Sequence, residues 1–126
     1  MAEVGDWADL IGKPFRYGGR GPDAFDCYGL VAEMRRRSGL AVPDYISPRN
    51  DEEIAALIAT NVPLWVPCEL RPGALVALRL GRFVSHVGFA LSETQIIHAW
   101  QRTGGVTVEP IAAWQRRIAG TYTFRE

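Results

Sequence analysis

The chain has 126 residues, a formal net charge of zero and an isoelectric point near 6.7. This length fits one compact domain over residues 1–126 with a sizeable buried core. The balanced charge argues against a nucleic acid or an anionic membrane surface as partner, and no apolar run is long enough to span a bilayer. The first residues lack the basic start and apolar stretch of a secretory signal, which predicts cytoplasmic synthesis.

Helical patterns occupy the first half of the chain. A short helix is expected over Asp6–Ile11. A longer one is expected over Asp26–Ser38, where apolar residues recur at helical spacing. Asn50, followed three residues later by Glu53, imitates a capping box in front of a further helix that ends near Asn61.

After a linker over Pro63–Pro72, the pattern changes to short runs rich in β-branched and aromatic residues. Helices first and strands afterwards predict an α+β domain, in which N-terminal helices pack on a small, mostly antiparallel sheet. The expected strands are Ala74–Arg79, Phe83–Leu91, Thr94–Trp100, Val106–Glu109 and Thr121–Phe124, with one or two helical turns at Ile111–Arg117.

Cys27 stands where a loop crowded with glycine and proline runs into the Asp26–Ser38 helix. The first turn of a helix has unpaired backbone N–H groups and the positive end of the helix dipole. A cysteine there is expected to ionise readily, and the same amides can hold a developing oxyanion. Cys27 is therefore a candidate nucleophile, and Asp26 is a candidate helix cap.

The two histidines of the chain, His86 and His98, lie in neighbouring strand-like runs. If these runs form an antiparallel hairpin centred on Ser92, the two side chains are directly opposed on one face, with Cβ atoms roughly 4.5 to 5.5 Å apart. A two-residue turn would shift the register by one residue and separate the rings to opposite faces. The first geometry offers an imidazole base and a second imidazole that orients it.

The two cysteines permit other uses. Cys27 and Cys68 could form one disulfide, but nothing indicates an oxidising compartment, so free thiols are expected and Cys68 is interpreted as a small loop or core residue. A zinc ion held by both cysteines with His86 and His98 is an alternative, because this donor set is a known tetrahedral one. The sequence lacks the short-spaced ligand pairs of structural zinc sites, so neither a metal nor a cofactor is expected.

Five motifs follow one another at Gly12–Gly19, Asp26–Val31, Arg71–Val76, His86–Gly88 and Ile97–Ala99. In this order and spacing, they resemble the NlpC/P60 family of cysteine peptidases, which have a papain-like core and cut the peptide stems of bacterial cell walls. The resemblance covers most of the chain. It implies the papain-like NlpC/P60 fold and a peptidoglycan stem peptide as substrate, cut at an amide bond that involves D-glutamate and a diamino acid.

The resemblance also implies roles for individual residues. Cys27 would be the nucleophile, His86 the general base and later acid, and His98 the group that fixes the imidazole of His86. The family usually has a tyrosine at the position of Phe15, whose hydroxyl helps the oxyanion, and Tyr17 is the candidate that could supply this hydroxyl instead.

Two substrate-binding positions are also implied next to the nucleophile. Asp26 matches the family residue that helps to grip a substrate amine, whereas Tyr28 replaces the usual serine. Tyr28 and the loop over residues 18–23 resemble the branch found in tailed bacteriophages and prophages, which implies tail proteins as further partners and a virion tail, or release on lysis, as location. The alternatives are a peptidase that processes tail proteins and a noncatalytic tail assembly module.

Overall fold

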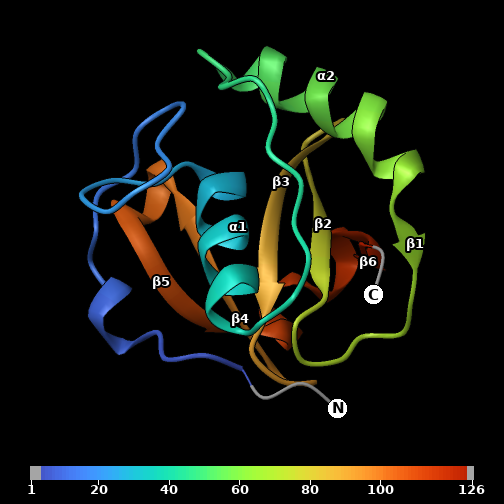
Figure 1. The fold of residues 1–126 in the computed structure, drawn as a ribbon. Helices are drawn as coiled ribbons and strands as arrows, with labels where there is room; N and C mark the ends of the chain where they lie inside the picture. Colours follow the sequence, from blue (N-terminus) through green and yellow to red (C-terminus); the bar gives the residue numbers. More distant parts are fainter. Residues whose placement is uncertain (1–3, 125–126) are drawn as a thin grey trace.

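The computed structural model describes residues 4–124. Within them, an antiparallel sheet has the strand order β1-β6-β2-β3-β4-β5, and two α-helices lie against it (Figure 1). The helices are α1 (Cys27–Arg37) and α2 (Asp51–Asn61), with 3-10 helices η1 (Ala8–Leu10), η2 (Val62–Leu64), η3 (Gln101–Thr103) and η4 (Ile111–Arg117). The strands are β1 (Val66–Pro67), β2 (Leu75–Leu80), β3 (Phe83–Ala90), β4 (Gln95–Trp100), β5 (Gly105–Pro110) and β6 (Ile118–Thr123).

The predicted α+β class, with helices before strands and an antiparallel sheet, is confirmed. Helix α2 begins as expected, because the Asn50 side chain accepts a hydrogen bond from the backbone N–H of Glu53 at 2.9 Å. In a complete capping box, the Glu53 carboxylate would accept a hydrogen bond from the backbone N–H of Asn50. Here it accepts from the backbone N–H of Arg49 at 2.9 Å, so the box is only half formed. The expected helix at Asp6–Ile11 is shorter, and only η1 forms there.

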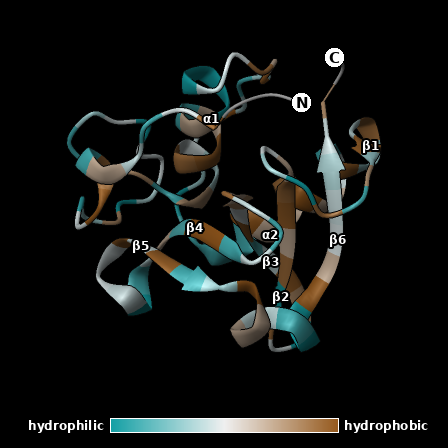
Figure 2. Cartoon of the chain, turned by 90° about the horizontal axis from the view of Figure 1, so that it is seen from below, coloured by the Kyte–Doolittle hydropathy of each residue, from teal (hydrophilic) through white to brown (hydrophobic). Residues whose placement is uncertain are grey.

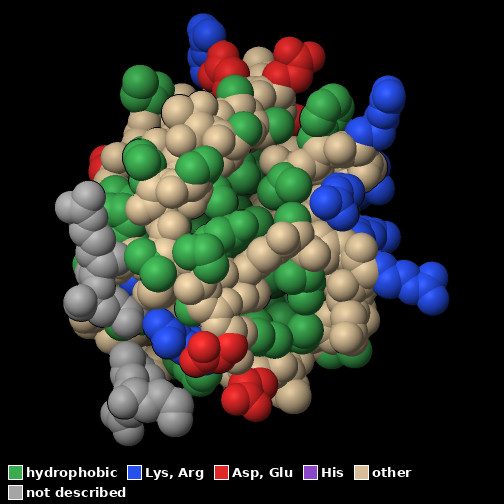
Figure 3. All heavy atoms as spheres, turned by 90° about the vertical axis from the view of Figure 1, so that its right-hand side faces the viewer, with side chains coloured by type: hydrophobic (Ala, Val, Ile, Leu, Met, Phe, Trp, Pro, Cys, Tyr) green, Lys and Arg blue, Asp and Glu red, His purple; other side chains and the backbone are tan. Residues whose placement is uncertain are grey.

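Strand β1 lies inside the segment that was predicted to be a linker. It has only two residues, and it forms because Val66 pairs with Thr123 and Pro67 with Tyr122 of β6. This pairing joins residues more than fifty positions apart in the chain, so local sequence patterns do not indicate it. Leu64 and Val66 remain exposed near this edge, and Figure 3 shows hydrophobic side chains at several places on the face that includes it.

The sheet buries apolar side chains on both faces. Figure 1 shows α1 in front of β3 and β4, and Figure 2 shows hydrophobic residues concentrated on β2 and β3. The core on the α1 side includes Leu30, Val31, Val87, Phe89 and Ile97. The core on the opposite face includes Val76, Leu78, Ile96, Ile111 and Trp114.

A glycine allows α1 to approach the glycine-rich loop that precedes it. A Cβ atom at Gly29 would lie 1.9 Å from the carbonyl oxygen of Gly19, so no other residue fits there without a shift of the backbone. The same carbonyl accepts a hydrogen bond from the backbone N–H of Asp26 at 3.0 Å. The loop therefore fixes the position of the residues that begin α1.

In the described part of the chain, no helix is long and apolar enough to cross a membrane.

Candidate active site

Cys27 is the first residue of α1, and its side chain is almost fully buried. Burial raises the pKa of the Cys27 thiol to about 12, and the negative charge of Asp26 adds to this rise. The backbone N–H groups of Val87, Tyr28 and Cys27 lower the pKa by less. The expectation of a readily ionised thiol is therefore wrong for this structure, because desolvation outweighs the favourable helix end.

The two imidazoles lie on β3 and β4 and contact one another. His86 Nε2 is 2.8 Å from His98 Nδ1, and both side chains are buried. The prediction that His86 and His98 lie directly opposite one another is wrong. Phe89 pairs with Ile97, so the hairpin is not centred on Ser92 and the two histidines are offset by two residues. The rings still share a face, because a shift of two residues preserves the alternation of side chains.

Glu109 of β5 extends this pair. Its Oε1 atom is 2.5 Å from His98 Nε2 and accepts a second hydrogen bond from Trp114 Nε1 at 3.0 Å. In the β4–β5 ladder, Thr107 is opposite His98, so Glu109 lies two residues further along the same face. Glu109 was not predicted as a site residue, although a carboxylate at the end of the expected Val106–Glu109 strand was a possible signal.

Burial lowers the pKa of both imidazoles. Burial and the proximity of His98 place the pKa of His86 well below its ordinary value of 6.5. Burial also lowers the pKa of His98, although the hydrogen bond and the charge of Glu109 act in the opposite direction.

The hydrogen-bond chain sets the positions of the protons. A carboxylate only accepts, so the Nε2 atom of His98 carries the hydrogen that Glu109 binds. His98 Nδ1 then accepts from Nε2–H of His86. The Nδ1 atom of His86 is left with its lone pair, which is the form that a general base needs.

Cys27 and His86 line the same cleft, which has a volume of about 680 Å³ and also includes Phe15 and Trp100. Cys27 belongs to the core on the α1 side, whereas the imidazoles contact Trp100 and Trp114 on the opposite side of the sheet. Among residues 4–124, no hydrogen bond joins the Cys27 thiol to either imidazole. Cys27 and His86 therefore reach one cleft from different faces of the sheet.

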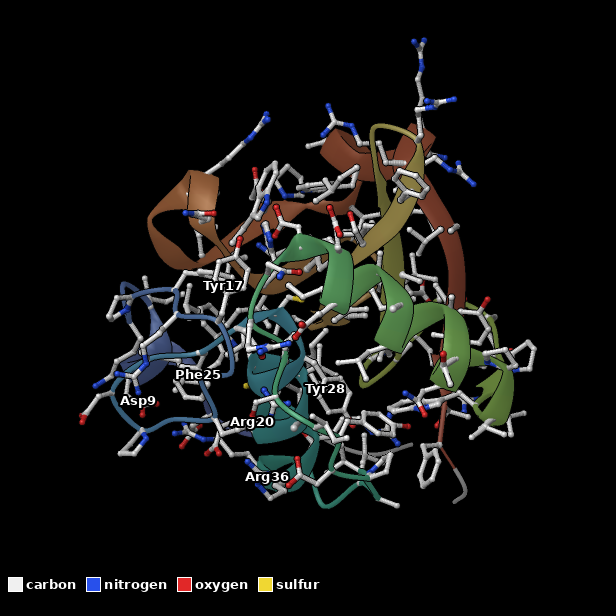
Figure 4. The ribbon with its side chains drawn as sticks, turned by 90° about the horizontal axis from the view of Figure 1, so that it is seen from above. Asp9, Tyr17, Arg20, Phe25, Tyr28 and Arg36 are labelled. Carbon is white, nitrogen blue, oxygen red and sulfur yellow. The ribbon has the colours of Figure 1, made fainter. Side chains whose placement is uncertain are left out.

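Phe15 lines this cleft, but the Tyr17 hydroxyl points to α2. It donates a hydrogen bond to Asp51 Oδ1 at 2.8 Å and lies 3.3 Å from Gln101 Oε1. Figure 4 shows Tyr17 beside the beginning of α2. The hydroxyl thus links the glycine-rich loop with α2 and η3.

Asp26 and Tyr28 are both engaged inside the protein. The Asp26 carboxylate accepts hydrogen bonds from Gly29 N at 2.6 Å, Gly18 N at 3.0 Å and Arg20 Nη1 at 2.8 Å. The Tyr28 hydroxyl donates to the carbonyl of Pro43, and burial raises its pKa. Arg20 lies over the Tyr28 ring, 5.6 Å from its centroid, and Figure 4 shows the two side chains together. The cation that Asp26 contacts here is therefore Arg20.

A second pocket also reaches the thiol, and its lining is almost wholly apolar. Helix α2 and the segments around it supply most of this lining, which includes Tyr45, Ile54, Leu57, Ile58, Val62 and Trp65. Cys27 belongs to the lining of both the cleft and this pocket. Cys27 therefore lies between a cleft that contains polar residues and a pocket that is mostly apolar.

Among residues 4–124, neither cysteine forms a disulfide, and the cysteines do not gather with the histidines as a set of metal ligands. Cys68 packs against the core on the face opposite to α1, away from the core that contains Cys27. In the range 4–124, no three His, Cys, Asp or Glu side chains gather in a way that could hold a metal ion.

A helix that begins with the buried Cys27 thus packs on an antiparallel sheet that carries two contacting histidines. The sequence model of the NlpC/P60 family matches residues 12–123, so the chain belongs to this family. Among solved structures, NlpC2 from Trichomonas vaginalis superposes with a TM-score of 0.66 at 19% identity, over 92% of this chain and 43% of that chain. NlpC1 from the same organism gives the same score at 20% identity, over 91% and 40%. These structures confirm the predicted fold.

Curated relatives include the probable endopeptidase p60 of Listeria innocua, which is 30% identical over 87% of this chain and 22% of its own length. The murein DD-endopeptidase MepS/murein LD-carboxypeptidase of Escherichia coli is 29% identical over 88% of this chain and 55% of its own length. The chain thus spans about a fifth of the listerial relative and about half of the one from Escherichia coli.

Proposed function

We propose that this chain is a cysteine peptidase that hydrolyses amide bonds in the peptide stems of bacterial peptidoglycan. The observation that carries this proposal is the chain of hydrogen bonds from His86 through His98 to Glu109, together with the cleft that His86 shares with Cys27. Relatives named as endopeptidases support the reaction class. The family resemblance supports a bond that involves D-glutamate and a diamino acid.

In the first half of the proposed reaction, His86 Nδ1 takes the thiol proton while the Cys27 sulfur bonds to the amide carbon. The pKa of the thiol is raised and that of His86 is lowered, so proton transfer accompanies the attack and does not precede it. Hydrogen bonds between a base and its nucleophile are often long without substrate and tighten when it binds. The electron pair of the carbonyl moves to its oxygen, where the backbone N–H of Cys27 can stabilise it.

In the second half, the carbon–nitrogen bond breaks and the leaving amine takes the proton from His86. The remaining thioester is attacked by water, which gives a proton to His86 and releases the carboxylic acid. The carbon–sulfur bond breaks, and the Cys27 thiol regains its proton. His98 and Glu109 act throughout as positioning residues, because they keep the lone pair of His86 at Nδ1.

The direct test is incubation of the purified protein with purified muropeptides, followed by mass spectrometry of the products. We expect cleavage within the stem, no cleavage by Cys27→Ala, and normal cleavage by the matched control Cys68→Ser, because Cys68 lies outside the cleft. Intact muropeptides after incubation with the folded wild-type protein would refute the proposal.

A specific observation favours a second substrate, a tail protein processed by the same machinery. Asp26 and Tyr28, which flank Cys27, are engaged inside the chain, and Asp26 already contacts the cation of Arg20. The same incubation with candidate tail proteins tests this alternative. If tail proteins are cleaved and muropeptides are not, a tail protein replaces the stem peptide as the proposed substrate.

The finer part of the proposal is association with a phage-type tail, either in the virion or on lysis. The resemblance of the loop over residues 18–23 and of Tyr28 to the phage branch supports it. The test is detection of the chain by antibody in purified tail particles after induction of the host's prophages. Its absence both from these particles and from the lysate would overturn this part without affecting the assay on muropeptides.

A further inference from the structure

Two arginines line the cleft that contains Cys27 and His86. Arg102 belongs to η3, and Arg117 ends η4. On the side formed by α2, the lining instead includes Asp51 and Glu52. The cleft is therefore polarised, although the chain as a whole is neutral.

The two guanidinium groups are held by aromatic rings and not by carboxylates. Arg102 lies 5.6 Å from the centroid of Trp100, and Arg117 lies 5.1 Å from that of Trp114. In the part of the chain that the structure describes, neither arginine forms an ion pair, whereas Arg20, Arg36, Arg37, Arg49 and Arg71 each do. A cation–π contact occupies the face of a guanidinium and leaves its N–H donors at the edge free.

The supporting rings are themselves fixed next to the imidazoles. The ring centroids of Trp100 and Trp114 are 5.3 Å apart. The centroid of the His86 ring lies 5.5 Å from that of Trp100 and 5.8 Å from that of Trp114. Trp114 is held further by its hydrogen bond to Glu109. Both arginines therefore contact an aromatic layer that lies beside the candidate base.

A guanidinium binds a carboxylate through two parallel N–H···O bonds, and this geometry also gives specificity. A cleft with low-dielectric walls strengthens such charge interactions. Asp51 and Glu52 repel an anion from the α2 side, so a negatively charged group is directed to the side of the arginines.

We propose that Arg102 and Arg117 form a subsite that binds a carboxylate of the substrate, so that the chain prefers stem peptides with free carboxylates over those in which they are amidated. This inference rests on the proposed function and adds a selectivity to it. It makes Arg102 and Arg117 specificity-determining residues, with no role in the chemical steps.

The test compares two synthetic stem peptides that differ only in carboxylate against carboxamide groups. We expect wild type to have the higher kcat/KM for the carboxylate form, and the ratio of the two values to fall roughly tenfold or more in the variant R102Q/R117Q. The matched control R79Q/R116Q removes the same charge from exposed arginines that do not line the cleft, and it should keep the wild-type ratio. An unchanged ratio in R102Q/R117Q, or an equal fall in the control, would overturn the subsite.

A binding measurement separates this inference from the proposed function. Calorimetry on Cys27→Ala with the same two peptides measures the preference without any turnover. Tighter binding of the carboxylate form that is lost on adding R102Q/R117Q supports the subsite even if wild type cleaves neither peptide. Equal binding of both peptides refutes the subsite even if wild type cleaves them.

Discussion

The carboxylates of Asp26 and Glu109 lie at opposite ends of the candidate machinery and differ in what they hold. Asp26 is fully buried at the start of α1 and binds two backbone amides and a guanidinium. Glu109 is 32% exposed on β5 and binds an imidazole and an indole. The first carboxylate fixes the backbone that carries the thiol, whereas the second fixes the proton positions of the proposed base, His86. Loss of Asp26 should thus lower stability, and loss of Glu109 should lower activity.

The largest effect is expected when the proposed base, His86, is removed. His86→Ala should lower kcat/KM for a cleaved muropeptide by roughly a thousandfold, since general base catalysis contributes on this order. The same variant should slow alkylation of Cys27 by iodoacetamide, measured in a Cys68→Ser background so that one thiol reacts. Labelling as fast as in the parent protein would instead favour a noncatalytic assembly module. Phe15, which stands where the family usually has a tyrosine, also supports this alternative.

Removal of Glu109 should give the next largest loss of activity. In Glu109→Ala, His98 loses the acceptor that selects its tautomer, and kcat/KM should fall roughly tenfold or more. Glu109→Gln keeps an acceptor oxygen, which the Trp114 N–H orients, and should retain more activity. The contrast between the two carboxylates fails if Glu109→Ala lowers the free energy of unfolding as much as Asp26→Ala does.

Substitution of Asp26 should act mainly on folding. Asp26→Ala removes the cap of α1 and leaves Arg20 without its buried partner, so the free energy of unfolding should fall by roughly 1 to 3 kcal/mol. Urea denaturation measures this change. Asp44→Ala is the matched control, because Asp44 also pairs with Arg20 but is mostly exposed, and it should have little effect.

The smallest effect concerns pH. The pKa values of His86 and His98 are lowered in the folded chain, so the unfolded chain binds more protons between those values and 6.5. The free energy of unfolding should therefore fall as the pH drops from about 6.5. Denaturation at several pH values checks this, and the variant H86Q/H98Q should lose most of this acid sensitivity.

The sequence allowed prediction of the parts of this fold that depend on local signals. The cap at Asp26, the side-chain contact of Asn50 and the alternation in β2 to β4 all follow from residues close in the chain. Strand β1 and the β3–β4 register depend on distant pairing or on the length of a turn, so they were missed or misplaced.

The candidate site shows the same limit. The positions of Cys27, His86 and His98 as possible partners were evident from their motifs, because each motif is short and local. Glu109 and the arginines of the cleft were not, since they meet the imidazoles and indoles only through the β4–β5 ladder and η4. Likewise, the raised pKa of Cys27 comes from burial, which a helix-start motif does not reveal.

The close packing of Gly29 against Gly19 has a consequence for protein engineering. The first turn of α1 and the loop before it fit together because Gly29 carries no side chain where it meets the backbone carbonyl of Gly19. A chimaera that exchanges the helix but keeps the loop, or the reverse, would misplace the thiol unless both partners are transferred as one cassette. Residues 18–31 contain both sides of this contact together with Cys27, so we expect them to be transferable as one segment.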